Sequence, residues 1–249
     1  MPEICQKSLA DAPWLDAKMR RLPGMQPLDM ADWLQFDDAF EAQRVERARL
    51  LREQEAQVLQ RLPEAAEAEQ ELAGLVSAES QRRGRRPLDH MVADPLKRIA
   101  TGVVEDMCIL QKRGSEHVLT AALLCFPANW RLSEKLGHPL TTIHAPVASY
   151  TDDIARRVQR LFDAVQAGRP LWRANALRYA TPELFQPDRH VARDDIAEGE
   201  GYLRSERQCI LRLPKTGAVV FSIHTRLVRM ADLNQEQNAG LKAHPLGHA

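Results

Sequence analysis

The sequence lacks the motifs that mark several common classes of protein. Its 249 residues contain only four cysteines (Cys5, Cys108, Cys125 and Cys209), and no two of them form a C-x-x-C pair. This spacing argues against a structural zinc site, a cysteine-ligated iron–sulfur cluster and a disulfide framework. The chain also has no G-x-G-x-x-G after a strand, no Walker loop, no H-E-x-x-H and no G-x-S-x-G. No nucleotide or flavin site is therefore recognisable from motifs.

A charge excess and a long apolar run are also missing. The 34 Lys and Arg residues are balanced by 34 Asp and Glu residues, so no global field draws the chain to nucleic acid or anionic lipid. The basic segment RRGRRPLDH (82–90) has no flanking aromatics for base stacking, and we interpret it as a solvated loop. The first residues lack an apolar signal region, and no run approaches the roughly 20 residues that span a bilayer. We expect a reduced, cytoplasmic protein that binds neither nucleic acid nor membrane.

The pattern of apolar residues predicts an antiparallel α+β fold. Hairpin-linked strands are expected at 106–112 with 117–126 and at 206–213 with 218–228, and a further strand at 171–180. Helices are expected between and before them, at 36–62, 64–83, 95–100, 131–137 and 151–168. We predict three segments: an extended N-terminal arm (1–35), a single domain with helical additions (36–232) and a flexible tail (233–249).

Among the eight histidines, His144 has an unusual context. Ile143, Pro146 and Val147 surround it, with Trp130 before it and Tyr150 after it. One interpretation is a core histidine bonded to a backbone carbonyl. The other is a neutral imidazole on an apolar wall that donates a lone pair to a haem iron. His224 lies in a predicted strand on the same face as Ser222 and Arg226, so it either faces solvent or lines a cavity.

Four stretches together resemble a known family. They are EDMCIL (105–110), LLCFPANWRLSEKLGHPLTTIHAPVASY (123–150), LWRANALRYATPELFQP (171–187) and LRSERQCILRLPKTGAVVFSIHTRLV (203–228). In this order they look like the haem-dependent oxidative N-demethylase alpha subunits, over most of the chain from Pro23 to Arg229. That family is similar to PAS domains, with a five-stranded antiparallel sheet and helices packed on one side. It binds haem b, and its characterised member oxidises a secondary methylamine with O₂ to a primary amine and formaldehyde.

The resemblance implies that His144, in the IHAPV motif, is the axial iron ligand. Further roles follow from side-chain chemistry. Arg131 and Arg207 are candidates to hold haem propionates, because guanidinium matches a carboxylate bidentately; the alternative for each is a surface ion pair. Trp130 and Trp172 are candidates to pack against the porphyrin, or are ordinary core residues.

Three further residues are candidates for catalysis. Glu206 is the carboxylate best suited to steer a cationic amine, and Tyr150 or Asn175 is a candidate to hydrogen-bond dioxygen or the substrate. The chain departs from the family pattern at Ala148, where a second proline is expected, and at His224 and Arg226, where arginine and an aromatic are more common. These departures put the choice of substrate in doubt and make His224 a rival iron ligand.

The resemblance implies a haem-dependent monooxygenase, that is, an oxidoreductase that acts on a small methylated amine. Because no flavin or iron–sulfur motif is recognisable, the electrons are expected from a separate flavin and iron–sulfur reductase. Two alternatives remain open: a haem-binding PAS-like sensor, and an interaction protein without a cofactor. The sequence contains no recognisable output module, which counts mildly against the sensor.

Overall fold

The fold is built on one antiparallel sheet. The computed structural model describes residues 3–85, 87–144, 151–188, 196 and 199–246, without the side chains of His144 and Asp152. Its strands are β1 (Gln26–Pro27), β2 (Leu59–Arg61), β3 (Asp106–Arg113), β4 (Glu116–Leu123), β5 (Leu171–Tyr179), β6 (Tyr202–Arg212) and β7 (Val219–Arg229). They pair in the order β1-β5-β6-β7-β3-β4-β2. The expected α+β class and both expected hairpins, β3–β4 and β6–β7, are confirmed.

The helices are α1 (Phe40–Glu53), α2 (Glu55–Val58), α3 (Ala66–Arg82), α4 (Pro95–Ala100), α5 (Leu140–His144), α6 (Asp152–Ala164) and α7 (Gln235–Ala243). Local chemistry explains several of their ends. The Asp94 carboxylate caps α4 by accepting from the amides of Leu96 and Lys97. Thr151 caps α6 by accepting from the amide of Ile154.

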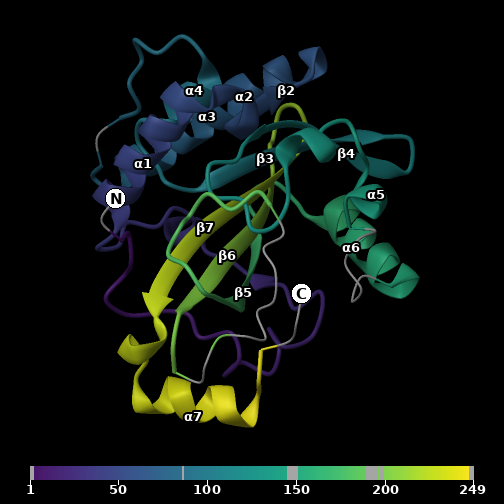
Figure 1. Cartoon of the computed structure of the whole chain (residues 1–249). Coiled ribbons are helices and arrows are strands. Elements are labelled where there is room, and N and C mark those ends of the chain that lie inside the picture. The colour runs from purple at the N-terminus through teal and green to yellow at the C-terminus, as the bar shows by residue number, and fades with distance from the viewer. Residues whose placement is uncertain (1–2, 86, 145–150, 189–195, 197–198, 247–249) are drawn as a thin grey trace.

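The two faces of the sheet bury separate apolar clusters. On β6, Cys209 and Leu211 point to the cluster that includes residues of α1, α3 and α4. We call this side the arm face, because the N-terminal arm also packs on it. Ile210 points the other way, to a cluster with Phe162 and Val165 of α6 and its C-terminal end, and we call that side the α6 face. Figure 1 shows α1–α4 grouped apart from α5 and α6. Helices thus cover both faces, whereas the resemblance implied helices on one side.

Two local expectations were wrong. Residues 59–61, expected in a helix, form β2, because pairing with β4 covers the edge of the sheet and overrides helix propensity. The expected flexible tail contains α7, whose capping box joins Asn234 and Gln237. The indole Nε1 of Trp14, in the arm, donates to the carbonyl of Gln237 at 3.0 Å, and α7 lies at the end of the sheet away from α1–α4 (Figure 1).

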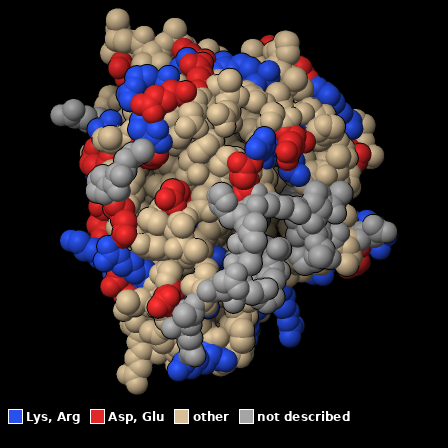
Figure 2. All heavy atoms as spheres, viewed as in Figure 1, with Lys and Arg blue, Asp and Glu red and all other residues tan. Residues whose placement is uncertain are grey.

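Charges are mixed on the face of the molecule that Figure 2 shows. Lys and Arg side chains alternate with Asp and Glu around a broad area of other residues, in accord with the net charge of zero. None of the helices in the described part of the chain is long and apolar enough to cross a membrane.

Candidate functional site

A row of polar side chains crosses β5 and β6 on the α6 face. Asn175 lies directly opposite Glu206 in the β5–β6 register, so the two side chains share this face. The Asn175 Nδ2 donates to Glu206 Oε2 at 3.4 Å, and the Gln208 Nε2 donates to the same oxygen at 3.2 Å. Glu206 is only 8 % exposed. The two hydrogen bonds from neighbouring amides hold its carboxylate in place.

Arg204 fixes the other oxygen of this carboxylate. Its Nε lies 3.5 Å from Glu206 Oε1, and its side chain is 1 % exposed. The two terminal nitrogens donate to the carbonyls of Leu184 and Phe126. Because the guanidinium is anchored to the backbone at two points, it provides a rigid positive group behind Glu206.

Arg173 extends the row at the other end. Its Nη1 donates to Gln208 Oε1 and its Nη2 to the carbonyl of Met19, both at 3.4 Å. Its Nε is buried without a hydrogen-bond partner among the described residues. Burial lowers the pKa of Arg173 below its usual value, although Glu206 partly offsets the effect. Sequence inspection did not single out Arg173, although its two-residue spacing from Asn175 places both on one face of a strand.

Half-buried apolar side chains lie beside the core of the α6 face. They pack against the cluster around Phe162 and Ile210 and are Met25, Trp130, Ile143, Val158 and Phe221. Ile143 immediately precedes His144, the last residue of α5. Lys135 Nζ donates to the carbonyl of Ile143 at 2.6 Å and so fixes this end of the helix. The side chain of His144 lies outside the described residues, as do Ala148 and Tyr150.

Arg207 and Trp172 lie on the arm face. The Arg207 guanidinium carbon lies 3.8 Å from the centre of the Trp172 ring, a cation–π contact. Its Nη1 is 3.3 Å from Asp11 Oδ2 of the arm. Glu206 and Arg207 are neighbours in the chain, but they project from opposite faces of the sheet. Arg207 therefore does not lie beside Glu206 in one site.

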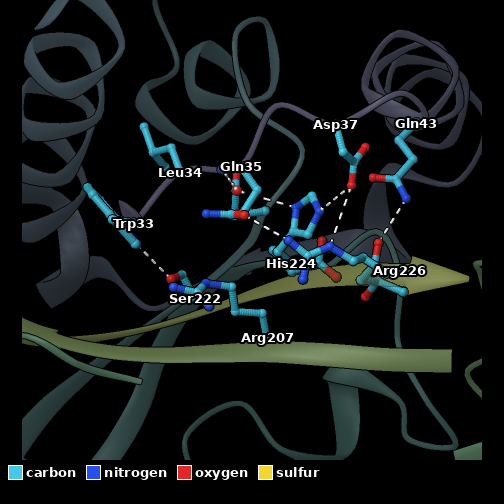
Figure 3. Close-up of polar contacts among 12 residues, drawn as sticks. Trp33, Leu34, Gln35, Asp37, Gln43, Arg207, Ser222, His224 and Arg226 are labelled. Atoms are coloured by element: carbon cyan, nitrogen blue, oxygen red, sulfur yellow. Dashed lines mark hydrogen bonds and ion pairs between the residues drawn. The ribbon is translucent and has the colours of Figure 1, made fainter. Parts of the chain in front are cut away.

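His224 lies on the arm face between two carboxylates, one of which, Asp37, is labelled beside it in Figure 3. Its Nε2 is 3.0 Å from Asp37 Oδ2, and its Nδ1 is 3.4 Å from Glu105 Oε1. Burial alone would lower the pKa of this imidazole, but the hydrogen bond with Asp37 and the adjacent carboxylate of Glu105 outweigh burial and raise it. The two flanking carboxylates thus favour the protonated form of His224.

The same cluster binds the N-terminal arm to the sheet. Arg226 pairs with Asp11 and donates to Gln35 Oε1 at 2.7 Å, and Trp33 Nε1 donates to Ser222 Oγ at 2.8 Å (Figure 3). The cluster contains three carboxylates, of Asp11, Asp37 and Glu105. When His224 is protonated, they are balanced by three cations, which are Arg207, Arg226 and His224. This balance allows the charges to be buried.

The predicted site residues thus separate into three places. Glu206, Asn175 and Trp130 belong to the α6 face, whereas Arg207, Trp172 and His224 belong to the arm face. Arg131 is exposed and pairs with Asp188 on the surface, which was the alternative considered for it. In the described part of the chain, no group of three or more His, Cys, Asp or Glu side chains is placed to hold a metal ion.

A protein-family model matches most of the chain. The model of the haem-dependent oxidative N-demethylase, alpha subunit-like family matches residues 24–83 and 79–245. The two matches run from just before β1 to just beyond α7 and include every strand of the sheet. They also include the polar row, the apolar residues beside it and His144. The chain therefore belongs to the haem-dependent oxidative N-demethylase alpha subunit-like family.

Proposed function

We propose that this protein binds haem b on the α6 face and oxidises a small methylated amine with O₂, releasing the methyl group as formaldehyde. The observation that carries the proposal is the family match over residues 24–245. The family's printed description names haem dependence and oxidative N-demethylation, and extending that reaction to this chain is our inference.

Several described residues of the α6 face are of the types that a haem site uses, which supports the proposal. A haem requires an apolar slot, an axial base and cations for its propionates. Trp130, Phe221 and Ile143 leave part of their apolar surface uncovered beside the core, and Arg173 supplies a cation on the same face. Apolar surface of this kind is a common feature of ligand sites.

We propose His144 as the iron ligand in preference to His224. Both ring nitrogens of His224 face carboxylates, and a protonated imidazole has no lone pair for a metal. His144 ends α5 next to Ile143, which packs at the α6 face. A haem iron needs only one or two protein ligands, so a cluster of three ligating side chains is not required.

When bound, the haem supplies the redox chemistry with O₂. The residues of the protein bind and orient the substrate and exclude water. Glu206, buried and fixed by Arg204, attracts the positive charge of a methylated ammonium group, and Asn175 and Gln208 hold the carboxylate toward it. The apolar residues beside the row exclude water. We further propose that the electrons come from a separate flavin and iron–sulfur reductase.

The test supplies haem b, O₂, a chemical reductant and dimethylamine, and measures formaldehyde. We expect formaldehyde to form only when all four are present. Glu206→Gln keeps the shape of the side chain but removes its charge, so it should raise KM for dimethylamine about tenfold or more. Glu200→Gln, an exposed control, should leave KM unchanged. If haem binds but no formaldehyde forms, the proposed enzymatic activity is contradicted and the sensor alternative is favoured. If no Soret band appears, the protein does not bind haem and the interaction-protein alternative is favoured.

A further inference from the structure

Arg173 differs from the three buried arginines of β6 and β7 in the partners of its guanidinium. Arg204, Arg207 and Arg226 each have a carboxylate oxygen at their guanidinium, from Glu206 or Asp11. Within the described ranges, no carboxylate forms an ion pair with Arg173. Its two long hydrogen bonds go to neutral oxygens, of Gln208 and Met19. Its Nε has no partner, a feature that it shares with the Nε of Arg204 and Arg207.

The surroundings make this lack of a partner costly. Arg173 is partly removed from water, and burial lowers its pKa more than the nearby Glu206 raises it. Burying a cation without a partner is unfavourable, so a group that stays in such a position in the free protein is well suited to receive an anion. The buried arginines of β6 and β7 have their anions built into the fold, whereas Arg173 pairs with no carboxylate of the described residues.

The neighbours of Arg173 indicate where that anion would lie. Gln208 bridges Arg173 and Glu206, because its Oε1 accepts from Arg173 and its Nε2 donates to Glu206 Oε2 at 3.2 Å. A cation and a carboxylate are thus held apart by a single amide on the α6 face. Leu171, two residues before Arg173 on β5, pairs with Ile210 of the apolar cluster, so Arg173 follows that cluster on the same face of the strand.

We propose that Arg173 binds a carboxylate of a ligand that enters the α6 face. The inference rests on the proposed function. Two ligands of that site can bring a carboxylate: haem through a propionate, and an N-methylated amino acid through its own carboxylate, with its ammonium group at Glu206. The planar fork of guanidinium matches either carboxylate bidentately.

The first arm of the test titrates the protein without haem with haem b and with haem dimethyl ester, and follows the Soret band. If Arg173 holds a propionate, the wild type binds haem about tenfold or more tightly than the ester, and Arg173→Gln binds the two equally. Arg173→Lys keeps the charge without the fork and should fall between them. Arg178→Gln is the matched control, because Arg178 lies on the same strand with its guanidinium at the carbonyls of Ile196 and Glu200.

The second arm titrates the haem-loaded protein with N-methylglycine and with dimethylamine, and follows the shift of the Soret band. If Arg173 holds a substrate carboxylate, the wild type prefers N-methylglycine by about tenfold or more, and Arg173→Gln loses that preference. The circular dichroism of each variant confirms that it is folded. If Arg173→Gln loses the preference for haem over its ester, Arg173 binds a haem propionate. If it loses the preference for N-methylglycine over dimethylamine, Arg173 binds the substrate carboxylate.

Two results would overturn the proposal, and they differ. If Arg173→Gln shows the same ligand preferences as the wild type in both titrations, Arg173 does not bind a carboxylate, and the proposed function is unaffected. If the wild type binds neither haem nor its ester, the proposed function falls, and the role of Arg173 falls with it.

Discussion

The imidazole of His224, on β7, lies 3.0 Å from the carboxylate of Asp37, which stands 187 residues earlier in the chain, between the arm and α1. The contact joins the start of the chain to the centre of the sheet. Asp37 and Glu105 flank the ring, while Arg226 and Arg207 carry the remaining positive charge near it. Hydrogen bonding in this cluster raises the pKa of His224 against the effect of burial.

Protonation of His224 therefore stabilises the fold. Because its pKa in the folded chain is raised above the ordinary value of 6.5, its contribution is fully present below about pH 6.5 and is lost as pH rises through the folded pKa. His224→Gln should lower the free energy of unfolding by about 3 kcal/mol at pH 6, the scale for breaking a buried ion pair. The loss should be smaller at pH 9, as measured by urea unfolding.

The control for this experiment is His90→Gln, since His90 is exposed. It should leave the pH profile of unfolding unchanged. An equal loss of stability at pH 6 and pH 9 in His224→Gln would show that the ring packs as a neutral side chain, contrary to our account.

A second prediction concerns the buried pair of Arg47 and Asp106, both fully buried. Arg47 Nη1 lies 2.6 Å from Asp106 Oδ1, and the Asp106 carboxylate also accepts from the amides of Cys125 and Phe126. Asp106→Asn places an amide N–H against these donors and leaves a buried cation unpaired. We expect a loss of about 3–5 kcal/mol in the free energy of unfolding.

Asp153→Asn on α6 serves as its comparison, because the Asp153 side chain is exposed and its nearest guanidinium contact is 3.7 Å long. Its effect on denaturant unfolding should be much smaller. Similar losses at the two positions would mean that the Arg47–Asp106 pair does not hold α1 to the sheet.

Gly240 tests whether α7 is docked on the arm. A Cβ built at this position would lie 2.2 Å from Leu15 Cδ2 and 3.0 Å from Trp14 Cδ1, and Trp14 is buried. Gly240→Ala should therefore lower the melting temperature. In a free helix the same change would stabilise by about 1 kcal/mol, so the sign alone separates a docked helix from a flexible tail.

Gly74, in α3, provides the matched substitution. Nothing lies within 4 Å of a Cβ built there, so Gly74→Ala should raise the melting temperature through helix propensity. If both substitutions stabilise, α7 does not pack against Trp14 as described.

Local patterns in the sequence predicted much of the fold. The apolar stripe of α6, the Asp94 cap of α4 and the two hairpins are encoded within short windows, and each was found close to its observed position. In contrast, β2 depends on pairing with β4, and α7 on contact with the arm. Such long-range contacts are not visible in a local pattern.

In the candidate site, too, local patterns could be predicted from the sequence and long-range contacts could not. Alternation along β6 already separates Arg207 from Glu206, whereas residue type alone suggests Arg207 for the haem propionates and Glu206 for the amine. Arg204 and Arg173 were missed because their roles depend on partners far along the chain, such as Phe126 and Met19. Pairing the strands at 171–180 and 206–213 and listing the residues of each face would have found the polar row.

The most direct test of the account is a titration of the purified protein with haem b, followed in the Soret region, for wild type, His144→Ala and His138→Ala. His138 is an exposed histidine six positions before His144. We predict that wild type and His138→Ala bind one haem with the same spectrum, and that His144→Ala loses the haem or shifts the band. An unchanged spectrum and affinity in His144→Ala would contradict the assignment of the iron ligand.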